Sequence, residues 1–229
     1  PGAGRLVTIE GLSVVGDVPG AFAERVIDAF GARAEDTFSI ALSGGDTARR
    51  CYERLADDAA TRIDWWKVDV YWGDERCVPH DHEDSNYRLA REALLDRVGA
   101  ANATHLMRCA EVDAYQLRIG DLGRFDVVHL GLGADGHTAS LFSGSEALAA
   151  DPGRLVALND DPAGRHEHTR MTLTLAGIAR ARLVLVTVEG EEKADALAAV
   201  ERGDDVPAAH IAGDRVVWLA DEAAASRLT

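Results

Sequence analysis

The sequence predicts an α/β fold with a mainly parallel sheet and helices on both faces. Three observations lead to this prediction. β-rich apolar segments recur along the chain, segments with apolar residues at helical spacing lie between them, and several predicted strands end in a glycine-rich or charged loop. The chain has 229 residues without an internal repeat or a linker-like stretch, so we expect a single domain spanning residues 1–229.

Strands and helices alternate along the chain. In the first half we predict strands at residues 6–9, 38–42 and 67–72 and helices at 21–30, 48–55 and 86–98. In the second half we predict strands at 127–132, 182–188 and 215–219, a helix that opens at 138–142, a helix at 194–200 and a short helix from Asp221 to Leu228. The run at 127–132 is the clearest strand, because its apolar side chains are typical of a strand buried on both faces.

Composition limits the classes of partner. The formal net charge is −15, which argues against nucleic acids and anionic membrane surfaces as partners. No apolar run approaches the ~18 residues of a membrane span, and the first residues lack the apolar core of a signal peptide, so we expect a soluble cytoplasmic protein. The three cysteines are widely spaced and form no CxxC pair, which predicts a reducing compartment and no disulfide.

A glycine turn with the sequence SGGDT follows the predicted strand at 38–42 and opens the next helix. Backbone N–H groups and the positive end of the helix dipole meet at such a turn, which can bind an anion such as phosphate. An ordinary strand-to-helix turn capped by Ser43 or Thr47 is the alternative interpretation.

A charged loop with Asp74, Glu75 and Arg76 follows the predicted strand at 67–72, and the sequence HDHE occupies residues 80–83. Together with Cys77 this run could suggest a metal site. Its spacing matches no common zinc pattern, so we expect a solvated loop and no metal.

Asp135 and His137 lie in a glycine-rich loop directly after the predicted strand at 127–132. A tight turn with a solvated carboxylate and imidazole is the alternative interpretation. His166 and His168 could bind substrate, but we expect them to lie in an exposed loop. Lys193 lies at the start of a helix, where a cation opposes the dipole, although pairing with Glu189 would also explain it.

Right-handed connections in a parallel sheet bring loops of this kind to one edge. The sequence therefore predicts an anion-binding region, made of the glycine turn with Arg76 and Lys193, beside the pair Asp135 and His137. A neutral imidazole can act as a general base, and a nearby carboxylate can fix its tautomer. Because the sequence has no GxSxG motif, attack by activated water is favoured over a covalent nucleophile.

The same loops resemble the signatures of the 6-phosphogluconolactonase family. GLGADGHTASLF at 131–142 resembles the family's GxGxDGHTASLFPG signature, and SGGDT at 43–47 its SGGSTP turn. WGDERCVP at 72–79, followed by DSNY at 84–87, resembles W-G-D-E-R-x-V-P…D-S-N-Y. RMTLT at 170–174 and the segment at 190–194 are similar to R-I-T-L-T and GxxKA.

The resemblance implies a cofactor-free hydrolase with a modified Rossmann-like sheet, acting on a phosphorylated sugar lactone. It implies that His137 is the general base, and that Asp135, Asp74 or both orient the imidazole or bind sugar hydroxyls. The residues expected to hold the phosphate or the polar sugar edge are Ser43, Gly44, Gly45, Thr47, Arg76, Arg170 and Lys193. The expected partner is a small molecule, with no nucleic acid and no membrane, and the chain is expected to be a monomer or a small homo-oligomer.

The sequence departs from the family pattern at the glycine turn, where Asp46 and Ala48 replace Ser and Pro, and at Ser143, which replaces the Pro of LFPG. An acidic Asp46 would repel a phosphate bound there. Two other functions remain open. Deaminases of the same superfamily carry a Glu at the position of Phe142, an apolar residue that favours the lactonase. A non-catalytic sugar-phosphate sensor is the other alternative, and Asp46 is the feature that allows it.

Overall fold

The computed structural model describes residues 9–229, which build a seven-stranded sheet in the order β1-β10-β9-β6-β2-β3-β5. Every neighbouring pair in this sheet is parallel. Its strands are β1 (Leu12–Val14), β2 (Phe38–Leu42), β3 (Val68–Trp72), β5 (Ala103–Thr104), β6 (Phe125–Gly131), β9 (Ala181–Val188) and β10 (Val216–Ala220). The predicted α/β fold with a mainly parallel sheet is confirmed.

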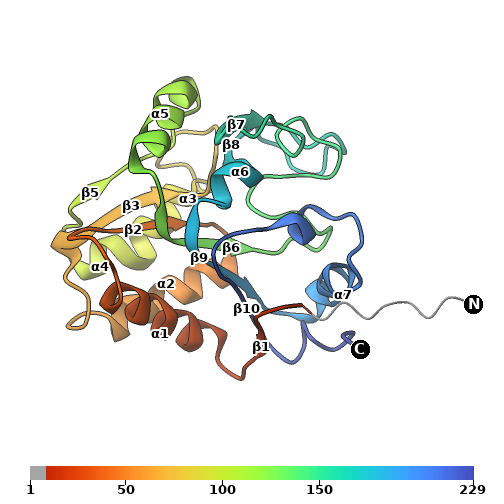
Figure 1. Ribbon diagram of the computed structural model, residues 1–229, viewed down its shortest axis with the longest axis horizontal. Helices are drawn as coiled ribbons and strands as arrows, with labels where there is room; N and C mark the ends of the chain where they lie inside the picture. The colour runs from red at the N-terminus through yellow and green to blue at the C-terminus, as the bar shows by residue number, and fades with distance from the viewer. Residues whose placement is uncertain (1–8) are drawn as a thin grey trace, which may run out of the picture.

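Helices cover both faces of this sheet: in Figure 1, α1 and α2 lie below it, and α5 and α6 lie above it. The α-helices are α1 (Val18–Gly31), α2 (Asp46–Asp58), α3 (Asn86–Ala90), α4 (Asp96–Val98), α5 (Val112–Leu122), α6 (Leu175–Ile178) and α7 (Ala194–Arg202). A π-helical segment, Arg91–Leu95, joins α3 to α4, and short 3-10 turns occur at Trp65–Lys67, Cys109–Glu111, Glu191–Lys193 and Pro207–His210. None of the described helices is long and apolar enough to cross a bilayer.

Helix α1 illustrates how the sequence determines where a helix begins and which face it buries. The Asp17 side chain accepts a hydrogen bond from the Gly20 backbone N–H at 2.9 Å, which caps the helix. Its buried residues recur at helical spacing, and among them Phe22, Val26 and Phe30 pack into the core. A helix with one apolar face and a capped start is therefore the stable local structure for this stretch.

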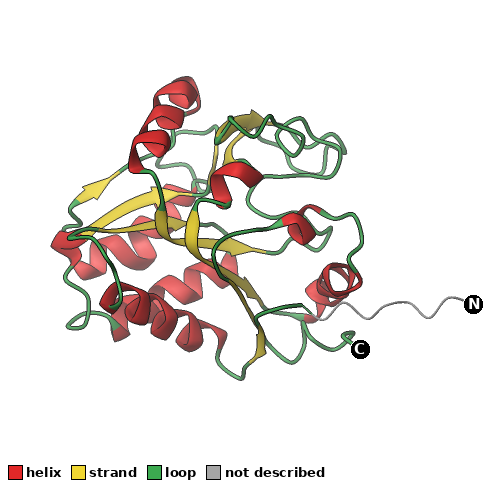
Figure 2. Cartoon of the chain, in the orientation of Figure 1, coloured by secondary structure: helices red, strands yellow, loops and turns green. Residues whose placement is uncertain are grey.

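A second sheet is antiparallel and separate from the parallel one. Its strands β7 and β8 are labelled near the top of Figure 1 and appear in yellow at the same place in Figure 2. It consists of β4 (Asp74–Arg76), β8 (Arg170–Leu173) and β7 (Val156–Asn159) in the order β4-β8-β7. The prediction of a charged loop at Asp74, Glu75 and Arg76 is wrong, because these residues form β4. Three polar residues carry no apolar alternation, and they form a strand because β8 supplies its partner.

Two predicted helices are absent from the described part of the chain. Residues 138–142 form turns with a bridge between Thr138 and Leu141, and Ala139 has a φ of +48°. Ser140 instead donates to Asp74 Oδ2 at 2.6 Å, a tertiary bond that a local pattern does not reveal. Residues 222–227 are turns rather than a helix, although Asp221 accepts from the Ala224 N–H as a cap would. Most of the strand predicted at 6–9 lies outside the described residues.

His129, a fully buried residue of β6, ties the central strands to α2. Its Nδ1 lies 2.8 Å from the Tyr52 hydroxyl and its Nε2 lies 2.9 Å from the Thr187 hydroxyl. The Tyr52 hydroxyl in turn donates to the Ser43 carbonyl at 3.1 Å and accepts from the Ser43 N–H at 2.6 Å. This buried network fixes the first residue of the glycine turn against β6.

Burial lowers the pKa of His129 from 6.5 to about 3, which makes the stability of the fold sensitive to acid. As the pH falls below 6.5, the unfolded chain binds a proton at His129 that the folded chain does not bind. Stability should therefore fall by about 1.4 kcal/mol per pH unit from this residue alone. In urea denaturation, the wild type should lose about 2 kcal/mol more than His129→Gln between about pH 7 and about pH 5. Equal losses in the two proteins would contradict this assignment.

Candidate active site

A cavity of about 240 Å³ opens at the carboxyl ends of β2 and β6, where the strand order of the parallel sheet reverses. It is lined by Ser43, Gly44, Gly45, Asp74, Arg76, Asn86, Gly131, Leu132, Gly133, His137, Ala139, His166, Arg170 and Lys193. The structure therefore brings together most of the side chains that the sequence analysis selected. Asp135 lies behind His137, and Thr47 lines an adjoining hollow with Asp46 and Arg50.

His137 and Asp135 form a hydrogen-bonded pair, with His137 Nδ1 at 2.5 Å from Asp135 Oδ1. The other carboxylate oxygen forms an ion pair with Arg165 at 2.8 Å. The hydrogen bond from His137, aided by its charge and that of Arg165, holds the pKa of Asp135 well below its usual range. With Nδ1 held by the carboxylate, Nε2 is the ring nitrogen that can accept a proton.

Gly133 is required for this pair. A Cβ atom at residue 133 would lie 2.1 Å from His137 Nδ1 and 2.7 Å from Asp135 Oδ1. Any side chain there would displace the imidazole or the carboxylate. The glycine pattern that marked this loop in the sequence thus has a steric cause at the pair itself.

Asp74 is buried and anchored from two sides. Its Oδ2 accepts from the Ser140 hydroxyl at 2.6 Å and its Oδ1 accepts from the Asn86 amide at 3.1 Å. Gly44 packs against that amide, because a Cβ at residue 44 would lie 1.8 Å from Asn86 Oδ1. Of the two carboxylates proposed to orient the imidazole, Asp135 makes that contact, and Asp74 faces the cavity between Ser140 and Asn86.

Glu75 organises the segment behind Asp74, a role that the sequence analysis missed. Its buried carboxylate accepts from the backbone N–H groups of Arg76, Asn86 and Tyr87 at 2.7 to 2.8 Å. The Ser85 hydroxyl donates to it at 3.0 Å. Burial raises the pKa of Glu75, and the three backbone donors partly offset this effect. The carboxylate thereby holds the start of α3 against β4.

Three cations line the cavity. Arg76 and Arg170 are partners in the β4–β8 register, and Lys193 ends the turn before α7. Burial lowers the pKa of Arg170, and the nearby positive charge of Arg76 lowers it further. Glu189, the proposed partner of Lys193, forms its ion pair with Arg50 at 2.7 Å. An anion in the cavity would relieve the repulsion between these cations.

His166 lines the cavity, so the prediction of an exposed loop is wrong for this residue. Its ring stacks on Phe142 at 4.8 Å and meets the His137 ring edge-on, also at 4.8 Å. Burial and the charges of His137 and Arg170 lower the pKa of His166. The ion pair of Arg165 with Asp135 brings this loop over the site, a long-range contact without a local sequence signal. Nitrogen and oxygen atoms of Asp135, His137 and His166 lie close enough together to bind a metal ion.

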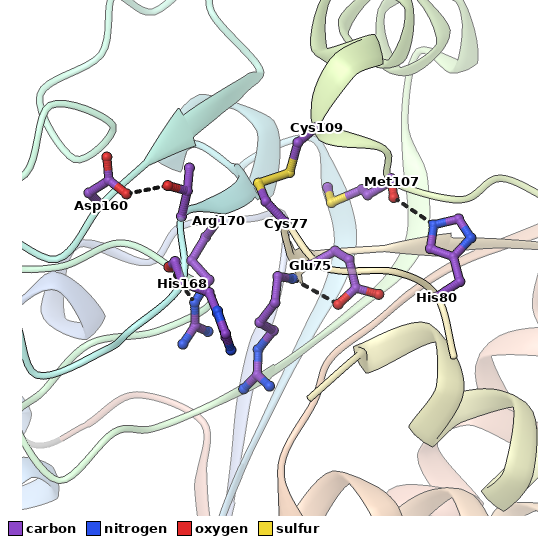
Figure 3. The surroundings of a disulfide bond; sticks show 10 residues. Glu75, Cys77, His80, Met107, Cys109, Asp160, His168 and Arg170 are labelled. Carbon is purple, nitrogen blue, oxygen red and sulfur yellow. Dashed lines mark hydrogen bonds between the residues drawn. A yellow bond between two sulfur atoms is a disulfide. The ribbon is translucent and has the colours of Figure 1, made fainter. Parts of the chain in front are cut away.

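Cys77 and Cys109 form a disulfide, which corrects the prediction that the chain has none (Figure 3). The two residues are 32 positions apart in the sequence, and their Cα atoms lie 5.6 Å apart. Cys77 directly follows β4 and Cys109 follows β5 in a connector, so only the folded arrangement brings them together. The bond links the segment that carries Arg76 to the start of the turn before α5. Cys51 is a buried free thiol.

The sequence is similar to that of known proteins over most of its length. Residues 15–218 match the family model described as glucosamine-6-phosphate isomerases/6-phosphogluconolactonase. A 6-phosphogluconolactonase of a Synechocystis species is 37% identical over 224 residues, covering 89% of this chain and 89% of the relative. One of Mycobacterium tuberculosis is also 37% identical, covering 90% of this chain and 92% of the relative.

Solved structures show the same similarity. The 6-phosphogluconolactonase from Trypanosoma cruzi superposes with a TM-score of 0.82 at 28% identity, covering 95% of this chain and 96% of that chain. A monomeric glucosamine-6-phosphate deaminase superposes with a TM-score of 0.79 at 17% identity, covering 94% of this chain and 99% of that chain. The second similarity shows the fold alone.

The disulfide can be tested by counting thiols. Unfolded in denaturant without reductant, the chain should expose one titratable thiol, and with reductant it should expose three. Reduction should lower the free energy of unfolding by about 2–4 kcal/mol, because the bond restricts the unfolded chain. Cys109→Ser is the matched control, whose stability should not respond to reductant. Three thiols before reduction would disprove the bond.

Proposed function

The chain belongs to the glucosamine-6-phosphate isomerase/6-phosphogluconolactonase family, and we propose that its cavity hydrolyses a phosphorylated sugar lactone through water activated by His137. The reaction converts 6-phospho-D-glucono-1,5-lactone to 6-phosphogluconate, a step of the oxidative pentose phosphate pathway. The observation that carries the mechanism is the pair of His137 and Asp135, 2.5 Å apart, beside a cavity with three cations.

Hydrolysis of the lactone needs one group that moves a proton twice. His137 Nε2 takes a proton from water as the water oxygen attacks the lactone carbonyl carbon. The tetrahedral intermediate collapses when the bond from this carbon to the ring oxygen breaks, and the imidazolium gives its proton to that oxygen. Asp135 stabilises the imidazolium between the two transfers and holds the ring with Nε2 available.

The cations supply the binding energy for the phosphate. Arg76, Arg170 and Lys193 face the cavity from β4, β8 and the turn before α7. The glycine turn at 43–45 contributes the start of α2, where backbone N–H groups favour an anion. The chain as a whole has a net charge of −15, which repels an anionic substrate. The positive charge gathered at the cavity attracts the phosphate group locally.

Asp74 suits the sugar hydroxyls better than the phosphate. A carboxylate has about four acceptor positions, of which Ser140 and Asn86 occupy one on each oxygen. The remaining positions can accept from hydroxyl groups of the lactone ring. A carboxylate here also repels phosphate, which favours binding of the substrate with its phosphate toward the cations and its ring toward Asp74 and His137.

The structure disfavours the two alternative functions at particular residues. Phe142 is buried against the rings of His137 and His166, so an acid–base group for amino-sugar ring opening is missing at that position. Asp46, the first residue of α2, is exposed and lines the adjoining hollow, and it is not among the residues that line the cavity. The feature that allowed a non-catalytic sensor therefore leaves the catalytic pair intact.

Replacing the imidazole tests the mechanism. His137→Ala should lower kcat by ~10²–10⁴, the usual contribution of a general acid or base. Stopped-flow measurement of lactone opening, with the spontaneous rate subtracted, would show the loss. His210→Ala is the matched control, because His210 pairs with Asp205 on the surface and should leave kcat unchanged. A wild-type kcat in His137→Ala would exclude this role.

Removing a cation tests the orientation of the substrate. Lys193→Ala and Arg76→Ala should each raise KM by about tenfold to a hundredfold with a smaller change in kcat, because each loses a charge-assisted contact to the phosphate. Arg50→Ala, which removes a cation paired with Glu189 in the adjoining hollow, should leave KM near the wild-type value. A lower kcat with an unchanged KM in both cavity variants would contradict phosphate binding by these cations.

A further inference from the structure

Two loops that leave the same end of the small sheet lie side by side outside the cavity. Arg76 of β4 pairs with Arg170 of β8, and the Cys77 N–H donates to the Thr169 carbonyl at 2.9 Å. The loop after β4 carries His82 and Asp84. The loop that enters β8 carries His168, which is labelled in Figure 3. The antiparallel pairing of β4 and β8 is therefore what brings these two loops together.

The three side chains converge on one carboxylate oxygen. His168 Nε2 lies 3.0 Å and His82 Nδ1 lies 3.6 Å from Asp84 Oδ2. The two imidazole planes are nearly perpendicular, at 83°, with ring centroids 5.7 Å apart. Ligand atoms on the three residues all lie within 4.8 Å of one another. Around a tetrahedral ion with bonds of about 2.0 Å, neighbouring ligand atoms are about 3.3 Å apart, and the two measured distances lie on either side of that value.

Hydrogen bonds already link the three residues. His168 Nε2 lies within hydrogen-bond distance of Asp84 Oδ2, at 3.0 Å. The Asp84 N–H donates to His82 Nδ1 at 3.1 Å, and a metal ion bound at that nitrogen would replace this hydrogen bond. A metal ion would take the place of the proton between His168 and Asp84.

We propose that His82, Asp84 and His168 form a binding site for a borderline divalent transition-metal ion such as Zn²⁺, beside the active site and separate from its cavity. Two imidazoles and one carboxylate are the donor set that such ions prefer, whereas Mg²⁺ and Ca²⁺ prefer oxygen ligands throughout. Water would complete the coordination, because all three side chains are partly open to solvent. This site extends beyond the proposed lactonase function and does not depend on it.

The charges around the site both oppose and favour a cation. The Arg76 guanidinium donates to the Asp84 carbonyl at 2.6 Å and the Arg170 guanidinium donates to the His168 carbonyl at 3.1 Å, and together they supply the positive charge that opposes a cation here. Exposed Glu83 and Glu167 lie next to the ligands in the sequence and offset it. An ion held here would join the two segments that present Arg76 and Arg170 to the cavity, in addition to the pairing of β4 with β8.

Zn²⁺ titration of the full chain tests the proposal, with the disulfide kept intact by omitting reductant. Isothermal calorimetry should show one Zn²⁺ site per chain whose dissociation constant rises about tenfold or more in His82→Ala, His168→Ala and Asp84→Asn. His80→Ala is the matched control, because His80 belongs to the same loop but contacts the Met107 carbonyl instead. Zn²⁺ should also raise the Tm of the wild type and of His80→Ala, and not that of the three ligand variants.

The other group of possible ligands, Asp135, His137 and His166, provides the main competing result. If His166→Ala loses Zn²⁺ binding while His82→Ala and His168→Ala keep it, the ion belongs to the active site and the proposal is wrong. Wild-type affinity in the three ligand variants, or no binding by the wild type, would also overturn it. Asp84→Asn keeps the size of the side chain, so its far-UV circular dichroism should match the wild type and separate lost binding from lost folding.

Discussion

The parallel pairing of β2 with β6 is the constraint on which the active site depends. Ile40 and Ala41 lie in register with Val127 and Val128, so both strands end at the same edge of the sheet. The glycine turn after β2 and the loop of His137 after β6 then meet where the strand order reverses. The buried contacts of His129 with Tyr52 and of Tyr52 with Ser43 hold the two loops in this relation.

The small antiparallel sheet adds two of the three cations that line the cavity. Gly73 joins the two sheets, because its N–H donates to the Leu42 carbonyl and its carbonyl accepts from the Leu173 N–H, both at 2.7 Å. This junction delivers Asp74 and Arg76 to the cavity, and β8 delivers Arg170. Buried Glu75 and the disulfide at Cys77 brace the same segment. A repulsive pair of arginines is kept in place by contacts that lie outside the cavity.

Patterns in the sequence predicted the parts of the structure that local chemistry determines. The apolar strands, the helices with one apolar face and the loops carrying His137 and Arg76 follow from the spacing of residue types. The spacing of residue types did not predict strand β4, the disulfide between Cys77 and Cys109 or the position of His166. Each of these depends on a partner distant in the sequence, namely β8, a connector after β5 and the pair of Asp135 with Arg165. The segment at 138–142 failed as a helix for the same reason, because Ser140 bonds to Asp74.

The central claim is that one cavity places a phosphate at its cations and a lactone carbonyl at His137. Its most direct test compares freshly generated 6-phosphoglucono-1,5-lactone with the unphosphorylated lactone, with the spontaneous hydrolysis of each subtracted. We predict acceleration confined to the phosphorylated lactone, because only the phosphate engages Arg76, Arg170 and Lys193. Equal acceleration of both lactones would show that the cations do not select the substrate, and acceleration of neither would contradict the catalytic role of the site.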